Sequence, residues 1–423
     1  MHAPGRGVSA PLLFRNLRLL DPASSDEARD GYEILVEGDR IREVSDAAIP
    51  SGSAEVVDCG GRVVMPGLID CHVHSMHSEV YMRRMEDVPL TLAAARGAKR
   101  LREMLDRGFT TVRDTGGTDW GMKQAVETGL IPGPRLLIAG RSIGPTGGHS
   151  DGRSRTNGGW SCPCCNGQAF LRLVVDGEDQ VRKAVREQMR QGCDHVKIMV
   201  SGGVASPYDP LDSLQFSIPE IEAAVEEAEN FGRYVLAHAY SAEAITRAVS
   251  SGVRTIEHGN LIDAPAAALM AERGAYLVAN LVAYVAMGER AADFGMPPAM
   301  LEKNAAVLEG GYRSLELCRE AGVKVAYGSD LLGQLGEEQS REFRIRAEVQ
   351  PAIEVIRSAT TIAAEVIRRP GRLGCVAPDA WADLVVVDGD PLADITLLEG
   401  QGRHMAAIVK GGRFHKNRLD RAA

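Results

Sequence analysis

The sequence predicts an α/β fold: a (β/α)8 TIM barrel carrying a small β-sandwich domain built from both chain termini. Three observations predict it. Eight short apolar segments alternate with amphipathic helical segments through the middle of the chain, both ends show strand-like alternation, and 423 residues exceed one ordinary compact domain. Apolar residues make up 44% and charged residues 25%, a composition that excludes a disordered chain.

The two ends of the chain carry the β-sandwich pattern. Residues 11–65 form short runs in which apolar and polar residues alternate and Gly or Asp marks each turn. The chain from about residue 375 onward repeats this pattern. We therefore expect residues 1–65 and 375–423 to form one β-sandwich domain, with the barrel between them at residues 66–374.

The middle of the chain supplies the barrel. Its eight predicted strands cover residues 68–74, 110–114, 135–140, 195–200, 234–239, 255–259, 276–281 and 324–330. Helical segments lie between most of them, and one begins with Ser217 followed three residues later by Glu220, a capping-box pattern. The connection over residues 141–176 is long for a βα loop, so we expect it to cover the barrel mouth and shape a substrate pocket.

Ionisable residues lie at or near the carboxyl ends of five predicted strands, where active sites of this fold are built. They are His72 and His74 of the first strand, Lys197 of the fourth, His238 of the fifth, His258 of the sixth and Asp330 of the eighth. Each alone has an ordinary explanation, such as a hydrogen-bonded histidine or a helix-capping aspartate. Their convergence on one barrel mouth instead predicts a metal site.

The residue types indicate which metal and how many ions. Neutral imidazoles and a carboxylate suit Zn²⁺ or a similar transition metal. A protonated Lys197 would repel a dication, whereas a lysine that has reacted with CO2 is a carbamate anion whose two oxygens can bridge two ions. We therefore expect two divalent metal ions, with Zn²⁺ favoured, and a carbamate on Lys197.

Several longer motifs resemble a known family. PGLIDCHVHS, the lysine, the two separate histidines and the late aspartate resemble the binuclear amidohydrolase superfamily over nearly the whole chain. More narrowly, TTVRDTGG, GPTGGHSDGR, KIMVSGGVASP, LAHAY, TIEHGNLID and YGSDLLG resemble its imidazolonepropionase-like branch. Within that branch the chain is most similar to Xaa-Pro dipeptidases (prolidases) and metallocarboxypeptidases, with ochratoxin-hydrolysing amidohydrolases as relatives.

The resemblance implies how the ligands divide between two metals. His72 and His74 would bind the first metal, His238 and His258 would bind the second, and the Lys197 carbamate would bridge both. Asp330 would contact the first metal and the bridging hydroxide.

The resemblance also implies roles around the scissile amide. His149 and Tyr240 would polarise or position the amide, and Asp330 would pass the hydroxide proton to the leaving nitrogen. The two metals carry more charge than the carbamate, Asp330 and hydroxide cancel, so we expect a substrate with a free carboxylate. Arg153 and Arg155 could bind that carboxylate bidentately, or they could belong to a solvated loop.

The predicted function is metal-dependent hydrolysis of an amide or peptide bond in a small carboxylate-bearing substrate. An Xaa-Pro or similar dipeptide, losing its C-terminal amino acid, is the first candidate. One alternative is a non-peptide amide, such as an ochratoxin-like N-acyl or aryl amino acid, or a carbamate. A second alternative is a catalytically silent structural relative, against which the intact ligand set argues.

Charge and hydropathy limit the partners and the compartment. The formal net charge is −9 with no basic stripe, which argues against nucleic acid. No run of about 18 apolar residues and no signal-peptide core are present, so we expect no membrane association and a cytoplasmic protein. The family resemblance suggests a homo-oligomer, as large as an octamer.

The eight cysteines fall into two groups. Five are scattered through apolar or mixed segments and are expected to be reduced core residues. The other three, Cys162, Cys164 and Cys165, form either a thiol-rich loop or a structural metal site that lacks an evident fourth ligand.

Overall fold

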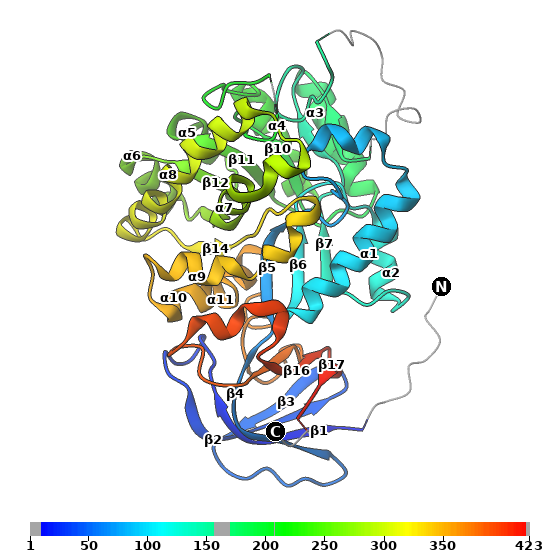
Figure 1. The fold of residues 1–423 in the computed structure, drawn as a ribbon, viewed down its shortest axis with the longest axis vertical. Coiled ribbons are helices and arrows are strands. Elements are labelled where there is room, and N and C mark those ends of the chain that lie inside the picture. The colour runs from blue at the N-terminus through cyan, green and yellow to red at the C-terminus, as the bar shows by residue number, and fades with distance from the viewer. Residues whose placement is uncertain (1–9, 156–169, 207, 420–423) are drawn as a thin grey trace.

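The computed structural model describes residues 10–155, 170–206 and 208–419. Figure 1 shows a helix-wrapped barrel above a β-rich part that holds both ends of the described chain. Within the described residues, no helix combines the length and apolar character needed to cross a bilayer. The three clustered cysteines lie outside the described residues, and the other five are buried with free thiols, as predicted.

The β-rich part is one mixed sheet of seven strands in the order β17-β16-β15-β4-β1-β2-β3. Its strands are β1 (Leu12–Leu19), β2 (Arg29–Glu37), β3 (Arg40–Ser45), β4 (Glu55–Pro66), β15 (Leu384–Val387), β16 (Met405–Lys410) and β17 (Arg413–Asn417). The chain termini meet where β15 pairs antiparallel with β4, with Val386 opposite Val64. The rings of Phe14 on β1 and Phe414 on β17 lie 6.0 Å apart although three strands separate them in the sheet. The sheet therefore folds back on itself around its own core, which confirms the predicted sandwich.

Period-two alternation explains how this sheet also packs on the barrel. Val64 and Val386 face the sandwich core, whereas their neighbours Val63, Val385 and Val387 belong to a core shared with the barrel. β4 passes into the first barrel strand through Gly67, where a Cβ atom would lie only 2.2 Å from the Thr110 hydroxyl oxygen. Only glycine fits this close approach.

The barrel has the eight predicted strands, each within a few residues of its predicted bounds. They are β5 (Leu68–Val73), β6 (Phe109–Asp114), β7 (Arg135–Ile138), β10 (Val196–Met199), β11 (Val235–Ser241), β12 (Thr255–Leu261), β13 (Tyr276–Ala279) and β14 (Val325–Tyr327). Two parallel ladders, β5-β6-β7 and β10 to β14, make up the wall. They meet where the amide of Asp330 donates to the His72 carbonyl at 2.8 Å and the amide of Asp194 donates to the Ile138 carbonyl at 2.8 Å.

Helices surround the barrel (Figure 1). They are α1 (Leu90–Asp106), α2 (Trp120–Glu127), α3 (Glu178–Arg190), α4 (Ile218–Asn230), α5 (Ala242–Ser250), α6 (Ala264–Arg273), α7 (Leu281–Arg290), α8 (Pro298–Ala321), α9 (Arg341–Ala347), α10 (Ala352–Ser358) and α11 (Thr361–Val366). Short 3-10 turns are η1 (Met82–Asp87), η2 (Ala291–Phe294), η3 (Gly333–Glu338), η4 (Ile395–Leu398) and η5 (Gly400–Gly402). The long predicted connection adds two short strands, β8 (Ser142–Gly144) and β9 (Arg172–Val174), which pair in parallel beside β10.

The predicted capping box begins α4. The amide and the hydroxyl of Ser217 donate to Glu220 Oε2 at 2.7 and 2.8 Å, and the Ser217 side chain also accepts from the backbone of the third helical residue. These contacts satisfy amide groups that have no partner within the helix.

We expect Ser217→Ala to lower the free energy of unfolding by about 1 kcal/mol, the usual contribution of an N-cap side chain. Urea denaturation followed by circular dichroism measures this change. Ser250→Ala, at an exposed serine that ends α5, is the matched control and should change the free energy by less than about 0.5 kcal/mol. Equal losses in the two variants would contradict the capping role.

Candidate metal centre

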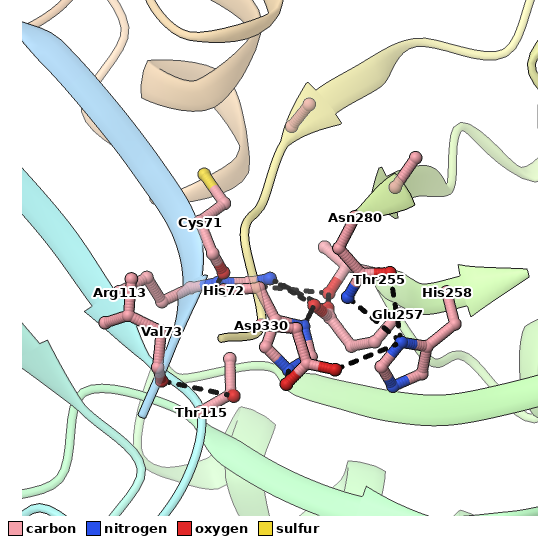
Figure 2. Close-up of polar contacts among 12 residues, drawn as sticks. Cys71, His72, Val73, Arg113, Thr115, Thr255, Glu257, His258, Asn280 and Asp330 are labelled. Atoms are coloured by element: carbon pink, nitrogen blue, oxygen red, sulfur yellow. Dashed lines mark hydrogen bonds and ion pairs between the residues drawn. The ribbon is translucent and has the colours of Figure 1, made fainter. Parts of the chain in front are cut away.

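The six residues selected from the strand ends all line one cavity of about 70 Å³ at the carboxyl end of the barrel. Figure 2 shows the Asp330 carboxylate between the rings of His72 and His258. Asp330 Oδ1 lies 3.3 Å from His72 Nε2 and 3.2 Å from His74 Nε2, and Oδ2 lies 3.7 Å from His258 Nδ1. Three possible ligand atoms, one from each of His72, His258 and Asp330, lie within 4.8 Å of one another, close enough to hold one metal ion.

The second half of the ligand set continues from His258. The ring centroid of His238 lies 4.5 Å from that of His258, which lies 5.1 Å from that of His72. Lys197 lies on β10, next to β11, which carries His238, and its side chain is buried. The four histidines thus form a continuous row, with the lysine and the aspartate lining the same cavity.

Hydrogen bonds at the back of three of the rings leave one nitrogen of each free to face the cavity. Nδ1 of His72 lies 2.7 Å from Glu257 Oε2, and Nδ1 of His74 lies 3.0 Å from the Gly116 carbonyl. Each Nδ1 therefore has its own partner, and each Nε2 faces Asp330, where it is the nitrogen available to a metal. His238 is oriented the other way, because its Nε2 lies 3.0 Å from the Gly202 carbonyl and Nδ1 is left for a metal.

A fully buried ion pair supports His72 from behind. Nη2 of Arg113 lies 2.8 Å from both carboxylate oxygens of Glu257, and Nε donates to the Cys71 carbonyl at 2.5 Å. Thr255 donates to Glu257 Oε1 at 2.6 Å. Figure 2 shows this chain of contacts running from Arg113 through Glu257 to His72. The pair orients the imidazole and increases its basicity toward a metal.

Sequence reasoning missed Arg113 and Glu257, although a signal was present. Both are ionisable residues inside strands whose residues are buried on both faces, and their charges are opposite. A charged residue in such a strand requires a partner.

The ionisation states suit metal binding. Burial lowers the pKa of His238 and of His258 well below the ordinary histidine value, so both rings are neutral, the form that can bind a metal. Burial also lowers the pKa of Lys197 to about 8, which increases the fraction of neutral amine, the form that reacts with CO2. Burial alone would raise the pKa of Asp330, but the charge of His72 and hydrogen bonds from His72 and His74 hold it well below the usual range. Asp330 in turn raises the pKa of His72 against the effect of burial, so a metal would have to displace a proton from this pair.

Two ligand residues adopt strained backbone conformations. His258 has φ +77° and Asp330 has φ +50°, in the left-handed region that residues with a Cβ atom rarely occupy. Such strain is typical of functional sites whose surroundings hold the chain in place. Both side chains line the cavity.

His149 and Tyr240 line the same cavity, as the resemblance implied they would. The His149 ring stacks on His238 with centroids 4.3 Å apart, and its Nδ1 lies 2.6 Å from Ser206 Oγ. The Tyr240 hydroxyl lies 3.0 Å from the Tyr284 hydroxyl, which lies 2.9 Å from His258 Nδ1. Ser206 and Tyr284 were not identified from the sequence, because nothing in their local patterns distinguishes them.

The two arginines, Arg153 and Arg155, lie away from the cavity, which favours the second of the two sequence interpretations, a solvated loop. Arg153 forms a bidentate pair with Asp151 at 2.7 and 2.5 Å, and Arg155 is exposed, with its guanidinium 5.1 Å from the Tyr208 ring centre. Neither lines the cavity, but Arg172 on β9 does. Among the described residues, no carboxylate lies within ion-pair distance of Arg172. Burial lowers the pKa of Arg172 to about 10, so it carries its charge at neutral pH.

A parallel barrel whose mouth gathers four histidines, a lysine and an aspartate defines the class of amidohydrolase-type barrel enzymes. Residues 63–413 match the amidohydrolase family, and the chain belongs to that family. It is therefore a hydrolytic enzyme, and its relatives support amide bonds as the bonds cleaved.

Three relatives illustrate the similarity. Ochratoxinase of Aspergillus niger is 28% identical over 425 residues, which cover 94% of this chain and 85% of ochratoxinase. A solved amidohydrolase is 49% identical with a TM-score of 0.95, covering 97% of this chain and 100% of that one. A prolidase solved in complex with N-methylphosphonate-L-proline is 46% identical with a TM-score of 0.94, covering 96% of this chain and 100% of that one.

We expect Glu257→Gln to weaken both the fold and the metal site. The neutral amide would leave the Arg113 charge buried without a counter-ion, a loss of about 3–5 kcal/mol, and would weaken the orientation of His72. Metal affinity should fall by about 10–100-fold. Competition against a chelator measures the affinity, and denaturant unfolding measures the stability. Glu187→Gln, which breaks an exposed pair with Arg190, is the control, and wild-type metal affinity in Glu257→Gln would contradict this role.

Proposed function

We propose that this enzyme hydrolyses the amide bond of a small substrate that carries a free carboxylate beside the scissile bond. An Xaa-Pro or similar dipeptide, which releases its C-terminal amino acid, is the first candidate. The observation that carries the proposal is the convergence of four imidazoles, Lys197 and Asp330 on one cavity.

The donor set fits two divalent ions. His72 and His74 would hold one ion, His238 and His258 the other, and a carbamate on Lys197 would join them. Bound ions of this kind lower the pKa of a bound water and polarise a carbonyl. Imidazole and carboxylate donors favour Zn²⁺. The lowered pKa of Lys197 and its burial beside the histidines support the carbamate.

The chain's own groups then divide the proton chemistry. Asp330, kept ionised by the neighbouring histidines, accepts the proton of the attacking water and delivers it to the leaving nitrogen. His149 uses Nδ1 to contact Ser206, which leaves Nε2 to donate to the oxyanion that develops on the carbonyl. The Tyr240 hydroxyl, held against Tyr284, positions the amide.

Arg172 is suited to bind the substrate carboxylate. It lines the metal cavity, and Ser142 on the neighbouring strand, its partner in the β8–β9 ladder, also lines it. A guanidinium without a carboxylate partner in the described part of the chain can form two parallel hydrogen bonds to an incoming one. Apolar residues, among them Met82, Met287 and Leu332, also line the cavity and suit a side chain such as proline.

A second candidate is an aryl amide of the ochratoxin type, because ochratoxinase aligns with 94% of the length of this chain. The same apolar walls would contact an aromatic group. A panel of Xaa-Pro, Xaa-Arg and N-aroyl-phenylalanine substrates separates the two candidates by kcat/KM. A cytoplasmic location and a homo-oligomer, as large as an octamer, stay predictions.

We expect Lys197→Ala to lose bound metal and at least 1,000-fold in kcat/KM, about 4 kcal/mol of transition-state stabilisation. A short-chain carboxylic acid should restore part of both, because it can replace the carbamate oxygens. Metal analysis and rates with and without propionate measure this rescue. Lys183→Ala on the exposed face of α3 is the control. Wild-type metal content in Lys197→Ala without any added acid would contradict the bridging role.

We expect Arg172→Met to raise KM at least tenfold for a dipeptide with a free carboxylate, about 1.4 kcal/mol of binding. The same dipeptide with an amidated C-terminus should show no such change, because it lacks the charge that Arg172 binds. Arg153→Met is the matched control and should leave the KM of both substrates unchanged. Equal increases in KM for the free acid and for the amidated dipeptide would show that Arg172 does not bind the carboxylate.

A further inference from the structure

A second, larger cavity of about 710 Å³ lies between α1, η3 and η5, outside the metal centre. We call it the α1–η3 cavity. Its charged lining consists of five basic and two acidic residues: Arg96, Lys99, Arg100, Arg107, Arg290, Glu103 and Glu337. Three of the basic residues have acidic partners, since Arg96 pairs with Glu79 at 2.6 Å, Arg290 with Glu337 at 2.6 Å and Lys99 with Glu103 at 3.3 Å.

The other two cations, Arg100 and Arg107, are buried against neutral oxygens. Arg107 is 1% exposed, and it donates to the side-chain oxygens of Gln339 at 3.0 Å and Gln401 at 2.7 Å. Its remaining nitrogen, Nη2, is buried without a hydrogen-bond partner. A buried guanidinium nitrogen without an acceptor is costly, so the positive charge of Arg107 is only partly compensated by the protein.

Arg100 faces the same cavity and bonds only to carbonyl oxygens in the described part of the chain. Nη1 donates to His77 at 2.6 Å and to His74 at 2.9 Å, and Nη2 donates to Gly333 at 2.8 Å. Burial lowers its pKa to about 10, which still leaves it protonated at neutral pH. Two buried positive charges without a carboxylate partner therefore border one cavity.

We propose that the α1–η3 cavity binds a small anion with two negative charges, of the phosphate or dicarboxylate class. Such a ligand neutralises the charge of Arg107 and Arg100, both of which line the cavity. The volume exceeds that of a phosphate ion, so it accommodates an anion attached to a small organic group.

Both arginines connect this cavity to the metal ligands. Arg100 holds the carbonyl of His74, which follows β5. Arg107 contacts Gln339, whose amide donates at 2.8 Å to Asp70, and Asp70 in turn accepts from the backbone amides of His72 at 2.9 Å and Ser329 at 3.2 Å. An anion in the cavity thus acts on the backbone that carries His72, His74 and Asp330, and its affinity is thermodynamically linked to metal affinity.

Isothermal titration of the metal-loaded full chain with inorganic phosphate and with succinate tests the site. Either anion could also bind to the metal ions of the main site. Charge variants on α1 therefore show whether the anion binds in the α1–η3 cavity. Lys99→Met should weaken the affinity about threefold and Glu103→Gln should tighten it about threefold, the scale of one partly screened charge. Lys183→Met, which removes an equivalent exposed lysine on α3, should leave it unchanged.

Arg107→Gln should weaken anion binding at least tenfold. If that variant does not fold, Lys99→Met and Glu103→Gln still test the site. Preference for phosphate or for succinate distinguishes a phosphorylated from a dicarboxylate ligand. Removal of the metal should change the affinity for the preferred anion at least threefold relative to the metal-loaded chain. Affinities that do not respond to the α1 variants, or no binding of either anion below 10 mM, would overturn the site. Equal affinities with and without metal would overturn the link.

Discussion

The buried Arg113–Glu257 pair is the interaction on which the arrangement of the site depends. It joins β6 to β12, and through His72 it reaches β5, so one charge pair ties together three barrel strands. Burying two charges is costly unless geometry and hydrogen bonds are well satisfied, and here Thr255 and the Cys71 carbonyl complete the shell. The gain lies in a histidine held in one orientation and one tautomer.

The second constraint is electrostatic. The chain has a net charge of −9, yet most groups that line the cavity of the candidate metal centre are cationic or neutral. Among the described lining residues, only Asp330 is acidic. Burial keeps His238 and His258 neutral and weakens the proton affinity of Lys197. This charge distribution supports the proposed metal ions at the donor atoms and the proposed anionic substrate at Arg172, although the protein as a whole is acidic.

Much of this was predictable from local pattern. The eight strands follow from short apolar runs between amphipathic helices. The six candidate ligands follow from polar residues at predicted strand ends, because a parallel barrel collects all such ends at one mouth. Partners such as Arg113 and Glu257 are 144 residues apart, and only the closed barrel makes them neighbours. Arg172 was missed for a similar reason, since the β8–β9 register that brings it to the cavity is not visible in the sequence.

The central claim is that a carbamate on Lys197 joins two metal ions in this cavity. Carbon-13 NMR of the chain prepared with labelled bicarbonate, together with metal analysis of the same sample, tests it most directly. We predict one carbamate signal for each chain with two bound divalent ions, and the loss of both in Lys197→Met. Two tightly bound ions without a carbamate signal would contradict it.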